Sequence, residues 1–334
     1  MMNRINAIWK ELESKTASKR GLVKIRFSDK SFCDIYLGLK YPEEFRMLVF
    51  RTPLKTGVNF NFVYDFKGLK FEKIYDSENN SYLLLNLVLV DIRFIDVFDS
   101  LINDVINNII EEDNIEIALK IYSNRLTLWQ SLFEKYNDQG LTPEQQRGLF
   151  GELFFLRKYL QYKSDFQKVL NTWVGTSKEV RDFQFNDWAL EVKTTSGNNH
   201  QKIHISSERQ LDISHLDTLF LYHLSLERAQ ESGESLPQII LSIQSLLKSD
   251  TISINRFQAK LYEVGYFDQH VNLYEEIGYH VRQDNYYKIE GDFPRVQENE
   301  MRKGVGDVKY TIIVSQCQHY LNSEIQVLEK ISRL

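Results

Sequence analysis

The 334-residue sequence has only two cysteines, five prolines and fifteen glycines. The two cysteines, Cys33 and Cys317, are too few for a disulfide-rich scaffold or a four-cysteine zinc site. No apolar stretch reaches the roughly 20 residues that cross a bilayer, and the first ten residues lack the apolar segment of a secretory signal. We therefore expect a cytoplasmic protein without membrane association. Two buried thiols are expected, with a single disulfide as the alternative.

The composition is that of a globular protein, with 43% hydrophobic and 26% charged residues. The net charge of −5 excludes a globally basic nucleic-acid coat protein. At roughly 100–200 residues per domain, the length allows two domains or one elaborated core.

The pattern of apolar residues divides the chain into four segments. Residues 1–94 alternate apolar and polar positions between turn signals, which predicts a mostly antiparallel β-rich region. Residues 95–140 carry two helical patterns and form a helical connector. Residues 141–225 read as a helix, three strands, a short helix and a strand, which predicts an α/β sandwich with a mixed sheet. Residues 226–334 form an α/β extension that completes this domain. Three strands are predicted in the extension, near Tyr279–Arg282, Tyr286–Ile289 and Val308–Ser315.

One helix has an especially clear start at residues 142–145, Thr-Pro-Glu-Gln. Thr at the N-cap and Gln three residues later can cap each other's backbone N–H groups, and Pro suits the first helical position. Within this helix, Gly148 and Gly151 predict the close approach of a neighbouring segment. Glu152 falls inside the apolar stripe rather than on the solvated side, where an unpaired charge is costly.

The most informative segment is residues 181–193, RDFQFNDWALEVK. A two-residue turn at Asn186-Asp187 would form a hairpin and place Asp182 directly opposite Glu191. Because side chains alternate along a strand, Lys193 shares the face of Glu191. Two carboxylates in register repel each other unless a cation lies between them. Mg²⁺ prefers carboxylate oxygens, and Lys193 could orient a water or offset charge on a phosphate.

A plainer interpretation exists for each of these residues. Acids and a lysine on one strand face commonly form a solvated salt-bridge surface, and Glu152 could pair with Arg147. The E-x-K spacing alone carries little weight, because Glu13-Ser14-Lys15 repeats it. The hairpin register and a carboxylate within an apolar helix together favour a metal site, which Glu152 could complete directly or through water.

These residues resemble the PD-(D/E)XK nuclease superfamily. The family closest in pattern comprises PD-(D/E)XK proteins encoded near DNA methyltransferases and ATPases in bacterial restriction-like operons. The segments that carry the resemblance are residues 148–153 (GLFGEL), 173–175 (WVG), 182–183 (DF), 191–195 (EVKTT) and 206–211 (SSERQL). Weaker likeness extends over most of the chain.

The resemblance implies an α/β (α+β) fold, with a restriction-endonuclease-like core of a central mixed β-sheet flanked by helices and an additional N-terminal β-rich region. It also implies Mg²⁺-dependent phosphodiester hydrolysis, with Mn²⁺ as a substitute. The residues at the catalytic positions are Asp182 and Glu191, the metal ligands, together with Lys193 and Glu152. Gln210 matches a supporting glutamine, and Arg181 stands where the superfamily name has proline.

We therefore expect a DNA endonuclease of a bacterial restriction or anti-phage system. Cutting both strands favours a homodimer, and the operon context suggests methyltransferase and ATPase partners. On a strand near the site, Lys202 and His204 share a face and could contact DNA phosphates, although a solvated face is the simpler interpretation. The alternative function is a catalytically silent DNA-binding or scaffolding subunit, which the negative net charge favours. An RNA nuclease is a third hypothesis.

Overall fold

The structure is a computed structural model, and it describes residues 2–14, 21–55, 64, 66–135, 139–177, 179–197 and 201–332. The chain divides into two compact units, Met1–Asn137 and Asp138–Leu334. The finer divisions near residues 94 and 225 stay predictions, and residue 225 falls inside a strand, β9 (Thr218–Gln230).

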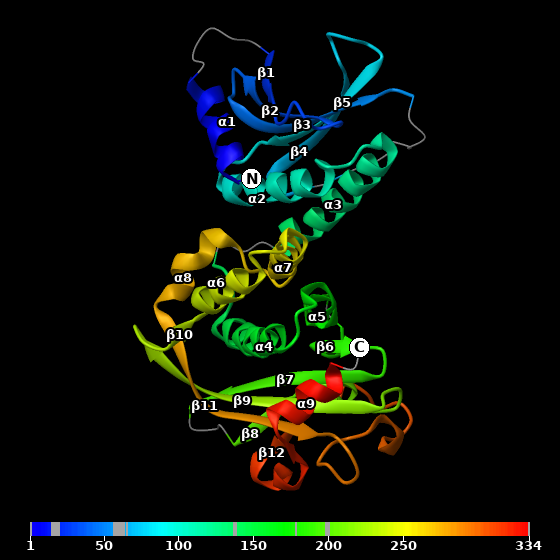
Figure 1. Cartoon of the computed structure of the whole chain (residues 1–334), viewed down its shortest axis with the longest axis vertical. Helices are drawn as coiled ribbons and strands as arrows, with labels where there is room; N and C mark the ends of the chain where they lie inside the picture. The colour runs from blue at the N-terminus through cyan, green and yellow to red at the C-terminus, as the bar shows by residue number, and fades with distance from the viewer. Residues whose placement is uncertain are drawn as a thin grey trace. The chain divides into compact units, whose positions relative to one another are not determined.

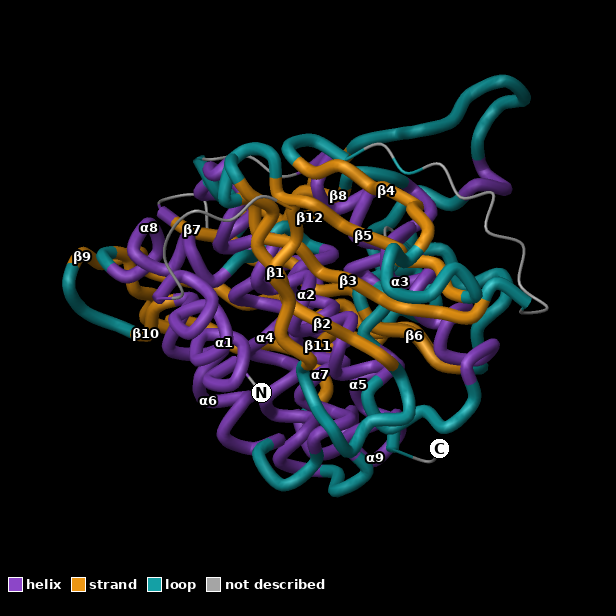
Figure 2. The backbone as a smooth tube through the Cα atoms, turned by 90° about the horizontal axis from the view of Figure 1, so that it is seen from above, coloured by secondary structure: helices purple, strands orange, loops and turns teal. Residues whose placement is uncertain are grey.

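The N-terminal unit combines an antiparallel sheet with helices. The strand order is β1-β2-β3-β5-β4, and every neighbouring pair is antiparallel. Figure 2 labels these strands, drawn in orange. Its elements are α1 (Met2–Ser14), β1 (Gly21–Arg26), β2 (Asp34–Tyr41), β3 (Phe45–Pro53), β4 (Leu69–Tyr75), β5 (Tyr82–Leu89), α2 (Ile95–Ile109) and α3 (Ile115–Lys135). The structure thus has strands followed by two helices, as the sequence predicts for this part of the chain.

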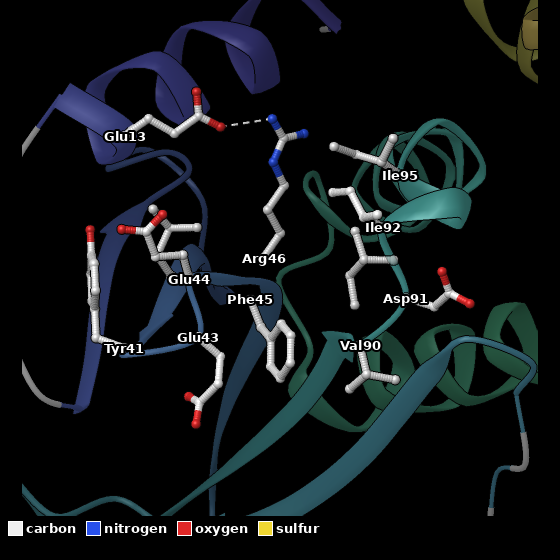
Figure 3. Close-up of a pocket in the computed structure, with 12 residues that line it drawn as sticks. Glu13, Tyr41, Glu43, Glu44, Phe45, Arg46, Val90, Asp91, Ile92 and Ile95 are labelled. Carbon is white, nitrogen blue, oxygen red and sulfur yellow. Dashed lines mark hydrogen bonds and ion pairs between the residues drawn. The ribbon is translucent and has the colours of Figure 1, made fainter.

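A hollow of about 810 Å³ opens in the N-terminal unit, beside the turn between β2 and β3 (Figure 3). Acidic side chains at Glu43, Glu44 and Asp91 line it together with apolar residues. The Arg46 guanidinium, which also lines it, donates a hydrogen bond of 2.8 Å to Glu13. None of the four residues at the predicted catalytic positions belongs to this hollow.

The C-terminal unit is built on a mixed sheet. Its strand order is β10-β11-β9-β7-β6, with β13 paired to β11. Strands β7 and β9 are parallel, whereas the β6–β7 and β9–β11 pairs are antiparallel. The remaining elements are α4 (Pro143–Tyr162), α5 (Phe166–Thr172), β6 (Phe183–Phe185), β7 (Trp188–Ser196), β8 (Lys202–Ile205), β10 (Glu234–Ser235), α6 (Leu236–Leu247), α7 (Thr251–Glu263), α8 (Val271–Glu275), β11 (Ile277–Lys288), β12 (Tyr310–Ile313), β13 (Leu321–Asn322) and α9 (Glu324–Ile331). The predicted mixed sheet flanked by helices is confirmed.

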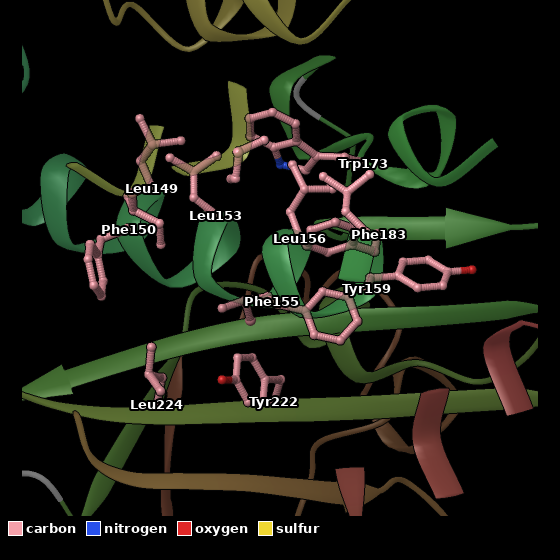
Figure 4. Close-up of a cluster of buried hydrophobic side chains, with 14 of the residues drawn as sticks. Leu149, Phe150, Leu153, Phe155, Leu156, Tyr159, Trp173, Phe183, Tyr222 and Leu224 are labelled. Atoms are coloured by element: carbon pink, nitrogen blue, oxygen red, sulfur yellow. The ribbon is translucent and has the colours of Figure 1, made fainter. Parts of the chain in front are cut away.

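Both faces of this sheet are covered (Figure 1). Leu190 and Val192 of β7 pack into the main core with side chains of α4 and its neighbouring helices. Figure 4 shows Leu153, Phe155 and Leu156 of α4 in this core. On the other face, Ala189 of β7 packs into a second core with side chains of β8 and β12. Consequently Glu191, although charged, is buried to about 1% exposure.

Helix α4 confirms its predicted start. Thr142 Oγ1 accepts from the Gln145 backbone N–H, and Gln145 Oε1 accepts from the Thr142 N–H. A side chain at Gly151 would collide with Thr194 of β7, so the predicted close approach is confirmed there. The same prediction is wrong for Gly148, where an added Cβ would meet no atom of the described residues within 4 Å.

Two further expectations have clear outcomes. The strands predicted near 279–282 and 286–289 are one strand, β11, and a register shift between Val281 and Gln283 explains the apparent interruption. Cys33 and Cys317 are buried free thiols, and burial raises the pKa of each to about 11. None of the helices in the described ranges is both long enough and apolar enough for a bilayer crossing.

Candidate active site

The hairpin of β6 and β7 positions the predicted acids. Phe183 pairs with Leu190 and Phe185 with Trp188, so the predicted two-residue turn is confirmed. Asn186 adopts a positive φ of 47°, which suits a tight hairpin turn. Continuing the register by one residue places Asp182 opposite Glu191. The Asp182 carboxylate also reaches the backbone of β7, where its Oδ2 accepts a 2.7 Å hydrogen bond from the Val192 N–H.

Residues 173–175 link Glu152 of α4 to this hairpin. Trp173 Nε1 donates a 2.7 Å hydrogen bond to Glu152 Oε2. The carbonyl of Asp182 accepts from the N–H groups of Val174 and Gly175, at 2.8 and 2.9 Å. A short loop therefore ties the α4 glutamate to the start of β6.

Gly175 leaves space between two of the carboxylates. A Cβ at this position would lie 2.9 Å from Asp182 Oδ1 and 3.4 Å from Glu152 Oε2. Both oxygens thus face the same small region, and any side chain at residue 175 would intrude on it.

Lys193 is the cation of the cluster. Its Nζ lies 2.7 Å from Glu191 Oε1, and only 17% of the lysine side chain is exposed. The second carboxylate oxygen of Glu191, Oε2, is buried and has no hydrogen-bond partner among the residues that the structure describes. A buried polar atom without a partner is costly, so this oxygen is suited to an additional ligand.

Burial and mutual repulsion raise the pKa values of the three acids. Burial raises the pKa of Glu191 to about 8, with Asp182 adding to the increase and Lys193 opposing it. Burial and Asp182 also raise the pKa of Glu152 well above its usual range, and the Trp173 hydrogen bond opposes this rise. Burial likewise raises the pKa of Asp182. Three carboxyl groups around one ammonium leave the site short of positive charge.

The same electrostatics keep Lys193 protonated. Burial alone would lower the pKa of its ammonium, but Glu191, Asp182 and Glu152 outweigh burial and raise it. Lys193 thus interacts with acids from α4, β7 and the start of β6.

The donor set suits a hard divalent cation held by two carboxylates. In the part of the chain that is described, no three His, Cys, Asp or Glu residues are grouped closely enough to hold a metal ion together. Mg²⁺ commonly takes one or two carboxylates and completes its shell with water and substrate phosphate. Within the described residues Glu191 Oε2 has no partner, and Asp182 Oδ1 faces the space beside Gly175. These two carboxylates therefore fit as ligands of such a site.

Gln210 and Arg181 lie beside the site without joining its acids. Gln210 Oε1 accepts hydrogen bonds of 3.1 Å from the N–H and hydroxyl of Ser206. Arg181 Nε donates to the Gln210 carbonyl at 3.3 Å, and its Nη2 donates to the carbonyls of Arg209 and Asp212. Burial lowers the pKa of this guanidinium, against the attraction of Asp212 and Glu191. Gln210 therefore contacts the residue preceding Asp182, and its supporting role stays a prediction.

Lys202 and His204 are both exposed on β8. His204 Nδ1 lies 3.0 Å from the Thr311 hydroxyl of β12. Their common face is confirmed by the alternation of exposed and buried residues on this strand, whereas a contact with DNA stays a prediction.

Sequence reasoning missed the roles of Trp173 and Gly175. Both lie in the WVG segment that contributes to the resemblance, but no periodicity marks them, because they stand between α5 and β6. A glycine and a buried aromatic donor shortly before the acidic strand are the signal that could have identified them.

The fold is that of a nuclease-like α/β protein. Its mixed sheet carries two acids and a lysine on one hairpin, and the covering helix carries a glutamate. The model of the family described as "Putative PD-(D/E)XK family member" (DUF4420) matches residues 5–315, and the chain belongs to this family. No curated protein and no solved structure matches the chain.

Proposed function

We propose that the chain is a Mg²⁺-dependent endodeoxyribonuclease of a bacterial restriction or anti-phage system, with Mn²⁺ as a substitute. The observation that carries this proposal is the cluster of Asp182, Glu191 and Lys193 beside Glu152, in which a buried carboxylate oxygen has no partner among the described residues. Membership in a PD-(D/E)XK family supports it.

Each residue has a distinct task in this proposal. Asp182 and Glu191 would hold the metal, and a bound divalent ion polarises the phosphate and makes a coordinated water more acidic. Lys193, held by Glu191, can donate a hydrogen bond to the attacking water or to a phosphate oxygen. It thereby offsets the negative charge that develops in the transition state.

Glu152 is a positioning residue for water. Trp173 donates to its Oε2, the oxygen that faces the space beside Gly175 and Asp182, and this oxygen can also accept a hydrogen bond from a water in that space. A carboxylate placed in this way can orient the water toward the phosphorus or carry its proton.

Plasmid cleavage tests the proposal. Purified protein is incubated with supercoiled plasmid in Mg²⁺, Mn²⁺, Ca²⁺ or EDTA, and nicked and linear products are quantified. We expect cleavage in Mg²⁺ and Mn²⁺, and loss of cleavage in Asp182→Asn and Glu191→Gln. Lys248→Ala, an exposed lysine of the same unit, is the matched control. Cleavage that persists in both acid variants would overturn the site assignment.

A catalytically silent DNA-binding or scaffolding subunit is the second candidate. The net charge of −5 and the occupation of Glu191 by Lys193 favour it. Calorimetric titration with Mg²⁺ and Mn²⁺ separates the two functions, because only the nuclease requires binding of a divalent ion. The same cleavage assay with an RNA substrate tests the third hypothesis, that the chain is an RNA nuclease.

The proposed partners follow from the reaction. Cleavage of both strands would be served by a homodimer, which sedimentation of the purified chain tests. Methyltransferase and ATPase partners are proposed from the resemblance alone, and co-purification of proteins encoded nearby would test them.

A further inference from the structure

The C-terminal unit contains a second feature, a pocket of about 200 Å³ at the N-terminal end of α4. Arg147 of α4, Ser196 at the end of β7, Arg228 of β9 and Tyr279 of β11 contribute to its lining. Glu144, in the first turn of α4, is the acidic side chain in this lining.

Arg147 lines this pocket, and not all of its guanidinium N–H donors are used in hydrogen bonds with described residues. Its Nη1 donates a 3.2 Å hydrogen bond to the Ser196 hydroxyl. Its Nε is buried and has no hydrogen-bond acceptor within the described ranges. A charged donor held away from water without an acceptor is unfavourable, so the group is suited to an anionic ligand.

Arg228 adds a second positive charge. It stands opposite Tyr279 in the β9–β11 pair and is exposed. Across the described parts of the chain, neither Arg228 nor Arg147 forms an ion pair with a carboxylate. Two guanidinium groups against Glu144 leave the pocket positive, and the N-terminal end of a 20-residue helix adds to this field.

The size and the donors favour a phosphate group. The pocket is smaller than the roughly 300–1,000 Å³ of typical small-molecule sites, so it suits one phosphate better than a whole nucleotide. Guanidinium groups match the geometry of phosphate oxygens and bind them with paired hydrogen bonds.

The pocket and the candidate active site are both lined by residues of α4 and β7. Arg147 precedes Glu152 by five residues on α4, a rise of about 7.5 Å. Ser196 follows Lys193 by three residues on β7, about 10 Å along the strand. We propose that this pocket binds a backbone phosphate of the nucleic acid that flanks the phosphate to be cleaved, an assignment that rests on the proposed function.

Duplex binding in EDTA tests this assignment without requiring cleavage. Affinity is measured by fluorescence anisotropy at several salt concentrations for wild type, Arg147→Gln and Arg228→Gln, with thermal unfolding to verify the fold. We expect each substitution to weaken binding about tenfold on duplexes of unrelated sequence. Each should also reduce the magnitude of the salt slope by about one, as for the loss of one phosphate contact.

Arg302→Gln is the matched control, because Arg302 is an exposed arginine of the same unit that does not line the pocket. We expect it to leave affinity near that of wild type. Arg147→Lys provides a second variant that keeps the charge but loses the paired geometry, and it should bind DNA more weakly than wild type. Unchanged affinity and salt slope in folded Arg147→Gln and Arg228→Gln would overturn the proposal.

A separate experiment distinguishes binding of free phosphate from binding of a DNA phosphate. Inorganic phosphate is titrated into wild type and the same variants, with the rise in melting temperature as the readout. Stabilisation by phosphate that requires both arginines, combined with unchanged DNA affinity, would assign the pocket to a free anion and overturn the DNA contact. Plasmid cleavage tests the nuclease function separately. If wild-type protein does not cleave plasmid but its DNA binding still depends on the two arginines, the nuclease function is rejected and the phosphate contact is not.

Discussion

Lys193 Nζ and Glu191 Oε1 lie 2.7 Å apart on β7, where Glu191 is about 1% exposed. This ion pair neutralises one carboxylate of the cluster, but the other oxygen of Glu191 has no partner in the described part of the chain. The lysine is thus held at the acids without occupying all of their ligand positions. A divalent ion and the ammonium can therefore act together at one carboxylate.

Substitution of Lys193 by Ala should reduce plasmid cleavage in Mg²⁺ by at least about 100-fold. The physical reason is the loss of the donor that offsets charge on the phosphate, a contribution of roughly 10²–10³ when one such donor is removed. Metal affinity, measured by calorimetry, should stay equal or increase, because the competing ammonium is gone. Lys248→Ala should retain wild-type cleavage. Equal rates in Lys193→Ala and wild type would mean that this lysine has no catalytic role.

Gly175→Ala should weaken divalent-metal binding by about 10–100-fold, the range typical of changes to residues that support metal ligands. Its Cβ would lie 2.9 Å from Asp182 Oδ1, so the carboxylate must move. Calorimetric titration with Mn²⁺ measures the effect.

Gly148→Ala is a matched control for this experiment, because an added Cβ there meets no atom within 4 Å in the part of the chain that the structure describes. It should leave metal affinity unchanged and stabilise α4 by up to about 1 kcal/mol. If Gly175→Ala bound metal as tightly as Gly148→Ala, the ion would not use the space beside residue 175.

The parts of the site that the sequence predicts are those governed by local rules. A two-residue turn fixes the β6–β7 register, so Asp182 and Glu191 could be paired in advance. Helical periodicity likewise marks Glu152 as an unusual acid. Trp173 escaped prediction because its bond to Glu152 joins residues 21 apart through an irregular loop. The sheet order β11-β9-β7 depends on long-range pairing, which no local pattern specifies.

The second core shows why the burial of Glu191 was harder to predict than the β6–β7 register. Ribbon β8–β12 covers the face of the sheet that carries Glu191, and β12 lies more than 100 residues beyond β7 in the sequence. Alternation within β7 alone leaves that face free to be solvated. The cover converts an ordinary acidic strand face into a buried cluster with raised pKa values.

Lys202→Ala tests the predicted DNA contact on β8. Because Lys202 is exposed and its face is solvated, the substitution should leave stability within about 0.5 kcal/mol of wild type. If Lys202 contacts a phosphate, duplex affinity should fall uniformly across sequences, and the salt slope should shrink by about one. Anisotropy titrations in EDTA measure both quantities. An unchanged slope would assign Lys202 to the solvated surface.

Asp76→Asn addresses the pH dependence of stability in the N-terminal unit. Asp76 is buried, and its Oδ2 accepts a 2.7 Å hydrogen bond from Arg51 Nε. Burial by itself would raise the pKa of Asp76, but the bonds from Arg51 and the Glu78 N–H outweigh burial and lower it. The ionised carboxylate therefore stabilises the fold above its unfolded pKa of about 3.9, and this contribution is lost as the pH falls through the lower folded value.

At pH 7 the Asn variant should lose roughly 1.5–3 kcal/mol of unfolding free energy, the value of a hydrogen bond to a charged group. The difference from wild type should narrow as the pH falls below about 4, because the carboxyl of the unfolded chain then takes up a proton while the folded carboxyl, with its lowered pKa, stays ionised until a lower pH. Urea unfolding at several pH values measures this difference. Glu78→Gln, whose side chain is 75% exposed and 3.9 Å from Lys24, should change stability little at any pH. A constant gap between Asp76→Asn and wild type from pH 7 to pH 3 would show that the charge of Asp76 does not stabilise the fold.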